Sequence, residues 1–420
     1  MIDRQPRRSG RGDLLKPVER YVAAVVKECI GLPRLRSILV VGSFGKGEGQ
    51  LIHRGGLGLP TRDLDILLVF RFPVPRASVE RVSQRLNSTL SPRKSEYYLN
   101  TEFLIELKAT TKFALTHFPD ISTYDARFSP LVWGEDIRRD IRLEPDHIPL
   151  RTSVRALVQK GIALIGVLDE SYFFRPIPED SKFIFLRELS RTYQEIATGL
   201  CLAAGHYSIS RDERLSYLSG NFSPVFRGLS RKLPGLVDRI EAWAEFKKSG
   251  KTPAGSTPLA SWFVARDDLL AVLSGISTQA LGLDLVSLPL GETVYGFLAE
   301  RYYTPIVHSL LRDTGFGKCP HLVQVGTKLL VTRDIFYSKA RRRYLPGETA
   351  GLVGLRIGPS VVLLVAVPEL LAAVNHDGDF AVDRVRHVAY LLGLNWQGAQ
   401  LTWNKVRSTL MRVVESTNFF

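Results

Sequence analysis

The N-terminal part of the chain changes repeatedly between helical and strand patterns of apolar residues. Apolar residues recur at steps of three and four over 15–30 and 77–90, which predicts two amphipathic helices. Short apolar runs over 35–41, 63–70 and 97–107 predict strands, the first of them rich in β-branched residues and too short for a helix. This order predicts a compact α/β unit with a small sheet.

Beyond residue 151 the apolar pattern becomes almost wholly helical. One stripe that should face a core steps by three and four through Leu186, Leu189, Tyr193, Ile196 and Leu200. Further helical segments are expected over 154–168, 224–247, 259–273, 295–311, 361–374 and 382–394, with a last helix around residues 406–414.

A chain of 420 residues is too long for one ordinary core, so several domains are expected. We predict an α+β protein with a disordered basic arm over 1–14, an α/β domain over 15–150 and a mostly helical region over 151–420. Proline and glycine make 249–258 the best linker candidate in the helical region. The proline-rich segment 110–150 is interpreted as connection and packing.

Composition indicates a soluble chain in a reducing compartment, so we expect a cytoplasmic protein. The three cysteines are far apart, which excludes a disulfide framework or a cysteine-ligated zinc. The apolar run 359–367 is less than half of the roughly 20 residues that cross a bilayer, so we expect a buried helix and no membrane contact. The net charge of +14 is typical either of a basic surface that contacts nucleic acid, nucleotides or anionic lipid, or of a basic proteome. The cluster 339–344 is either a nucleic-acid contact or a solvated helix face.

Two motifs carry candidate chemistry. The glycine-serine turn Gly42-Ser43-Phe44-Gly45-Lys46 follows the strand 35–41, begins a short helix and leads to a glycine-rich segment in which 53–60 should be a mobile loop. Asp63 and Asp65 open the next strand and share one face, because strand side chains alternate. Adjacent carboxylates repel each other unless a cation neutralises them, and backbone N–H groups in a small-residue turn suit a phosphate.

Other phosphate and metal motifs do not fit. The spacing of a P-loop is absent, and the glycines at 45, 47 and 49 do not form a dinucleotide-binding fingerprint. A His-Glu-x-x-His zinc motif is also missing from the sequence.

Together the two motifs resemble the polymerase-beta-like nucleotidyltransferase superfamily. Val41-Gly42-Ser43 and Asp63-Leu64-Asp65 match its Gly-Ser turn and its Asp-x-Asp strand. The chain is most similar to the bacterial and archaeal type that reads Gly-Ser-Phe-(Gly/Ala)-Arg-Gly-Glu-Gly, with Lys46 where arginine is common. The resemblance covers about residues 15–110 and implies a nucleotidyltransferase fold for the α/β domain.

The resemblance also implies roles for individual residues. Asp63 and Asp65 would hold two Mg²⁺ ions, and a third carboxylate is expected on a later strand. Glu106, between apolar neighbours, is favoured for this position, and Glu102 on the same face is the alternative. A third interpretation is that these glutamates only pair with Lys108 or Arg62, so that the third carboxylate is missing.

The nucleotide would be bound by the turn. Ser43 and the backbone amides of Gly42 to Phe44 would hold the phosphates, and Lys46 would neutralise phosphate charge. The implied activity is transfer of a nucleoside monophosphate from an NTP to a hydroxyl of a small molecule, protein or RNA, with release of pyrophosphate. The alternatives are a nucleotide- or RNA-binding protein with an impaired site, and a toxin-type or stress-type effector that modifies RNA or protein.

Overall fold

The chain forms two compact units, Met1–Ile148 and Pro149–Phe420, and each is considered by itself. The computed structural model describes residues 18–49, 51–54, 57–60, 63–94, 104–118, 120–253, 257–288, 292–311, 319–330, 359–376, 379–392 and 402–416. The expected basic arm over 1–14 and the cluster 339–344 lie outside the described residues.

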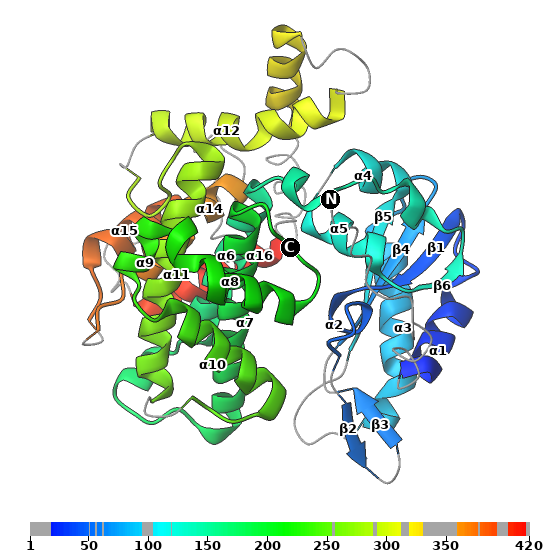
Figure 1. Cartoon of the computed structure of the whole chain (residues 1–420), viewed down its shortest axis with the longest axis horizontal. Coiled ribbons are helices and arrows are strands. Elements are labelled where there is room, and N and C mark those ends of the chain that lie inside the picture. Colours follow the sequence, from blue (N-terminus) through cyan, green and yellow to red (C-terminus); the bar gives the residue numbers. More distant parts are fainter. Residues whose placement is uncertain are drawn as a thin grey trace. The chain divides into compact units, whose positions relative to one another are not determined.

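The first unit contains a mixed four-stranded sheet in the order β5-β4-β1-β6 (Figure 1). Its strands are β1 (Leu35–Val40), β4 (Leu64–Phe70), β5 (Ile105–Thr111) and β6 (Leu131–Gly134). β1 runs antiparallel to β4 and β6, whereas β4 and β5 are parallel. Together with the helices of both units, this small mixed sheet confirms the α+β class.

One face of this sheet forms the core of the first unit with α1 (Glu19–Cys29) and α3 (Arg76–Lys94). Alternation along β4 buries Leu64, Ile66 and Leu68, while Asp65 and Leu67 between them are only partly buried. The expected helices 15–30 and 77–90 therefore exist, with shifted ends, and the carboxylate positions of β4 point away from this core.

The expected loop over 53–60 is wrong, because this segment belongs to a hairpin. β2 (Leu51–Arg54) pairs antiparallel with β3 (Leu57–Pro60), and Ile52 is opposite Leu59. The sequence signal was Gly55-Gly56 between two short leucine-containing runs, which is typical of a hairpin. The segment was predicted to be a loop because glycines are frequent in it.

Of the third strand expected over 97–107, residues 97–103 lie outside the described residues, and the described strand runs from Ile105 to Thr111, past the expected end. After it come α4 (Lys112–His117), α5 (Ile121–Phe128) and β6. The segment 110–150 is therefore more than connection, because it supplies a sheet strand. Two short 3₁₀ helices, η2 (Ile137–Asp140) and η3 (Pro145–His147), follow β6.

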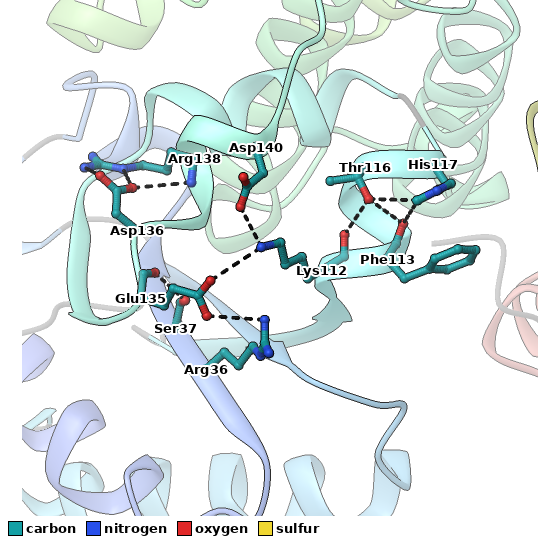
Figure 2. Close-up of polar contacts among 10 residues, drawn as sticks. All are labelled: Arg36, Ser37, Lys112, Phe113, Thr116, His117, Glu135, Asp136, Arg138 and Asp140. Atoms are coloured by element: carbon teal, nitrogen blue, oxygen red, sulfur yellow. Dashed lines mark hydrogen bonds and ion pairs between the residues drawn. The ribbon is translucent and has the colours of Figure 1, made fainter. Parts of the chain in front are cut away.

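Ion pairs connect the segment 110–150 to the start of strand β1 (Figure 2). Lys112 Nζ lies 3.4 Å from Glu135 Oε1 and 2.7 Å from Asp140 Oδ2. The Glu135 carboxylate also lies 3.3 Å from Arg36 Nη1, and the hydroxyl of Ser37 donates to the Glu135 carbonyl at 2.6 Å. Strand β1, the end of β6 and the start of α4 are thereby joined by side chains.

The second unit is helical in its described part. Its helices are α6 (Arg151–Val167), η4 (Glu170–Phe173), α7 (Glu179–Ala203), α8 (Arg211–Val225), α9 (Arg227–Lys232), α10 (Leu236–Ser249), α11 (Pro258–Leu281), α12 (Glu292–Leu311), α14 (Pro359–Ala372), α15 (Val382–Leu391) and α16 (Trp403–Ser416). All five residues of the predicted α7 stripe are buried in its core. Residues 320–330 form another helix.

Two expectations for this unit change. The single helix over 224–247 is wrong, because the chain breaks into α9 and α10 around Pro234 and Gly235, whose φ of +71° is left-handed. The stretch 249–258 connects α10 to α11, and both helices contribute to the same core.

The expected buried helix at 359–367 is confirmed as part of α14, whose residues from Val361 to Val367 are at most 1% exposed. Among the described residues, none of the helices is long and apolar enough to cross a membrane. The three cysteines are free thiols.

Candidate active site

Because of the sheet topology, three chain segments meet at the same end of the strands β1, β4 and β5, which is called the edge site below. Because β1 and β4 are antiparallel, the end of β1 lies beside the start of β4; because β4 and β5 are parallel, the start of β5 lies there too. In the β4–β5 register Asp65 is directly opposite Glu106, so both side chains leave the same face of the sheet. Gly42, Asp63, Asp65 and Glu106 therefore gather at this edge although up to 64 positions separate them in sequence.

Gly42 is in direct contact with the Asp65 carboxylate. Its φ is +63°, and a Cβ at this position would lie 2.0 Å from Asp65 Oδ2. The Val41 N–H also donates to the Asp65 carbonyl at 2.9 Å. Only glycine permits both the left-handed backbone and this close approach, so the turn and the carboxylate form one structural feature.

The turn itself is the short helix α2 (Gly42–Gly45). Its internal hydrogen bonds use the N–H groups of Gly45, Lys46, Gly47 and Glu48. Ser43 is partly exposed, whereas Phe44 is 3% exposed and belongs to the core of the unit. Phe44 can therefore contribute its backbone, but not its ring, to a ligand.

The carboxylates differ in their partners. Asp63 Oδ1 accepts a hydrogen bond from the Leu104 N–H at 3.2 Å. Asp65 Oδ1 accepts one from Lys108 Nζ at 2.7 Å, and Lys108 Nζ lies 3.7 Å from Glu106 Oε2. Lys108 thus bridges Asp65 and Glu106. The pair Lys108–Glu106 is one that the third interpretation named, whereas the contact of Lys108 with Asp65 was not expected.

The closeness of these charged groups shifts the pKa values of Glu106 and Lys108. Burial, together with the charges of Asp65 and Asp63, raises the pKa of Glu106 above 4.5, and Lys108 offsets this in part. Burial also works against the charged form of Lys108, but Asp65 and Glu106 outweigh it and raise the pKa of the ammonium. The cluster therefore carries excess negative charge that one lysine only partly neutralises.

A divalent cation needs several oxygen ligands that lie close together. In the part of the chain that the structure describes, no group of three His, Cys, Asp or Glu side chains is arranged to hold a metal ion. The carboxylate oxygens of Asp65 and Glu106 are nevertheless of the type that Mg²⁺ prefers, and they already share one cation, the Lys108 ammonium. These two residues fit a divalent ion that takes the place of the ammonium. Glu102, the alternative third carboxylate, lies outside the described residues.

Lys46 makes a contact that the sequence did not predict. Its Nζ lies 2.7 Å from Asp125 Oδ2 of α5, and the two side chains are only 21% and 13% exposed. Lys46 therefore joins the turn to α5. Asp125 and Lys108 are the residues that the motif search did not assign to the site, because no spacing rule connects them to Gly42 or Asp65.

No family model, no curated protein and no solved structure matches this chain. The function of the edge site is therefore inferred from its own residues: a glycine turn, two carboxylates in register and the lysine between them.

Proposed function

We propose that the first unit is a Mg²⁺-dependent nucleotidyltransferase that moves a nucleoside monophosphate from an NTP to a hydroxyl-bearing acceptor and releases pyrophosphate. The observation that supports this most is the contact between the Gly42 turn and the Asp65 carboxylate, with Glu106 in register beside it. A turn that suits phosphates and a carboxylate pair that suits a cation are thereby adjacent.

The residues divide the work by position. Ser43 and the first amides of α2 would hold the triphosphate. Asp65 and Glu106 would hold a divalent ion, and Asp63, whose carboxylate accepts from the Leu104 N–H, would have to turn toward it to join them. Bound Mg²⁺ would neutralise the triphosphate and lower the pKa of the acceptor hydroxyl. Asp65, fixed by the backbone of Val41 and Gly42, keeps its carboxylate at the phosphate end of the turn. Lys46 would neutralise phosphate charge only by giving up part of its ion pair with Asp125, which joins the turn to α5.

A second candidate is a nucleotide- or RNA-binding protein without transfer activity. Lys108 favours it, since an ammonium between Asp65 and Glu106 already neutralises part of the charge that a catalytic cation would neutralise. A third candidate shares the chemistry and differs in its target: an effector that modifies cellular RNA or protein.

The test is incubation of purified chain with each α-labelled NTP, MgCl₂ and a cell extract, with pyrophosphate release measured in parallel. The proposal expects a labelled acceptor and pyrophosphate, and it expects that Asp63→Ala/Asp65→Ala abolishes both. Asp146→Asn, an exposed carboxylate on η3, is the matched control and should retain activity. Mg-NTP binding without pyrophosphate would favour the second candidate. No Mg-NTP binding, and no effect of the double substitution, would rule out both.

The effector candidate has its own test. Expression of the wild-type chain should arrest growth, and expression of Asp63→Ala/Asp65→Ala should not. Normal growth with the wild-type chain would remove the reason to prefer an effector over a metabolic enzyme.

A further inference from the structure

A pocket of about 470 Å³ lies at the opposite end of β4. Phe70, the last residue of that strand, lines it together with Leu32 and the α3 residues Val79 and Val82. At about 3.3 Å per strand residue, the pocket lies on the order of 20 Å from the carboxylates at the start of β4. It is therefore separate from the candidate active site.

The polar part of the pocket wall consists of one hydroxyl and two guanidinium groups. Ser78, Arg81 and Arg85 line it from α3. Arg81 Nη2 lies 3.4 Å from the Ser78 hydroxyl, and Arg85 Nε lies 3.3 Å from Glu28 Oε2. Since a guanidinium has five N–H donors, both arginines retain donors for a ligand.

Two more arginines and a half-exposed aromatic ring directly follow residues of the pocket wall in the sequence: Arg34 follows Pro33, and Arg71 and Phe72 follow Phe70. Phe72 is 50% exposed, and the guanidinium carbons of Arg34 and Arg71 each lie 5.5 Å from its ring centre. Neither Arg34 nor Arg71 has a carboxylate within ion-pair distance in the described part of the chain. The apolar cavity is therefore followed, on the two segments that line it, by an aromatic ring and two arginines that have no acidic partner among the described residues. These groups together are called the pocket surface.

Arg34 has an unusual backbone. Its φ of +66° is the only left-handed value among the described residues other than glycine. Its carbonyl accepts from the Arg71 N–H at 2.9 Å, which holds both arginines at the same end of the β1–β4 pair. Glycine would adopt this conformation without strain, so the backbone itself gives no reason for an arginine at this position.

We infer that this surface binds a nucleotide, with the planar base against the apolar wall and Phe72 and the phosphate against the arginines. Guanidinium and phenyl planes stack on bases, and guanidinium groups pair with phosphate through two parallel hydrogen bonds. The pocket volume is in the range typical of small-ligand sites. The same chemistry is presented by a free nucleotide and by one residue of a single-stranded RNA. The inference does not rest on the proposed transferase activity.

The experiment measures binding of AMP by calorimetry and of fluorescent single-stranded A10 and U10 by anisotropy, in EDTA, so that Mg-NTP binding at the carboxylates does not contribute. Arg34→Gly is the decisive variant, because it removes the guanidinium and also relieves the left-handed backbone. It should bind about tenfold more weakly while its melting temperature stays equal or rises. Arg71→Gln and Phe72→Ala should weaken binding by about fivefold to tenfold.

Arg139→Gln is the matched control, since Arg139 is 87% exposed on η2 and not part of this surface. In salt titrations of the oligonucleotides, Arg34→Gly and Arg71→Gln should each reduce the slope of log affinity against log salt by about one, and Arg139→Gln should not. Binding of oligonucleotides alone would identify RNA as the ligand, and equal binding of AMP would identify a free nucleotide.

Three results would overturn the inference: no binding of any nucleotide, equal affinities of Arg34→Gly and Arg139→Gln, or equally effective competition by an aliphatic carboxylate such as decanoate. Asp63→Ala/Asp65→Ala should keep this binding in full. Failure at the pocket and failure of the transferase proposal are therefore separate outcomes.

Discussion

Lys108 occupies the position between Asp65 and Glu106 that a divalent cation would compete for. Lys108→Met removes this competitor and leaves the two carboxylates to repel each other. We expect Mn²⁺ or Mg²⁺ to bind several-fold more tightly, as measured by calorimetry and by Mn²⁺ resonance. Without metal the variant should melt a few degrees lower, and added Mg²⁺ should restore it.

Lys112→Met is the control for this change, because Lys112 pairs with Glu135 and Asp140 at the other end of the sheet (Figure 2). It should leave metal affinity unchanged. Equal or weaker metal binding by Lys108→Met would show that Lys108 is part of a closed ion-pair network and not a competitor.

Gly42 permits contact between the turn and Asp65, and an alanine there would have both a left-handed backbone and a Cβ 2.0 Å from Asp65 Oδ2. We expect Gly42→Ala to lower the free energy of unfolding by about 2 kcal/mol in urea titrations. Gly31→Ala is the control in the same unit, since nothing lies within 4 Å of its Cβ position. Similar stabilities of the two variants would contradict the close packing of Gly42 on Asp65.

Glu106 makes stability depend on pH. Because its folded pKa is raised above 4.5, the folded chain holds the proton more tightly than the unfolded chain, and this contribution is lost as pH rises through the raised pKa. Glu106→Gln cannot ionise, so its melting temperature relative to wild type should increase as the pH rises through the raised pKa of Glu106, measured in EDTA. Glu106→Asp keeps the titration and should follow wild type; a pH-independent difference for Glu106→Gln would exclude this account.

At the scale of elements, the pair Lys46–Asp125 joins the α2 turn to α5 in a largely buried position. Removing one partner leaves a poorly solvated charge, so Lys46→Met and Asp125→Leu should each cost about 2 kcal/mol of unfolding free energy. In the double variant Lys46→Met/Asp125→Leu most of this loss should be recovered. Urea unfolding of the four proteins measures the coupling, and strictly additive losses would show that the pair is not coupled.

Elements with a strong apolar period were predictable, and weakly patterned ones were not. Strands β1 and β4 and the helices α1 and α3 follow their periodicity. β5 continues past its predicted end at residue 107 although only Ile105 of its seven residues is buried, so its end is decided by pairing with β4 and not by an apolar pattern. The four-residue β6 gave too short a signal and was missed.

At the scale of the whole molecule, the sequence indicated the residue types of the edge site but not their partners. Asp63 and Asp65 were candidates from their local pattern, and Glu106 was a candidate from the resemblance to nucleotidyltransferases. That Lys108 would bridge two of them depends on the parallel β4–β5 register, and that Lys46 would meet Asp125 depends on the packing of α5 near the turn. Both are long-range consequences of the fold, for which local periodicity carries no information.

The two units have separate hydrophobic cores. The core of the first unit consists of residues between Val18 and Ile105, and that of the second begins at Val154. Because α6 contributes Val154, Leu157 and Leu164 without any exposure, we expect a 149–420 fragment to fold on its own and a 179–420 fragment, which lacks α6, to fail.

Differential scanning calorimetry tests this separation. The 149–420 fragment should unfold cooperatively, at a temperature within a few degrees of one transition of the full chain. The 179–420 fragment should show no cooperative transition and should bind a hydrophobic dye, since α7 and α11 would lose the helix that packs against both. If 149–420 also lacks a cooperative transition, its core is not sufficient for folding. In that case the helical unit needs the α/β unit to fold, and substitutions at the edge site must be interpreted in the full chain.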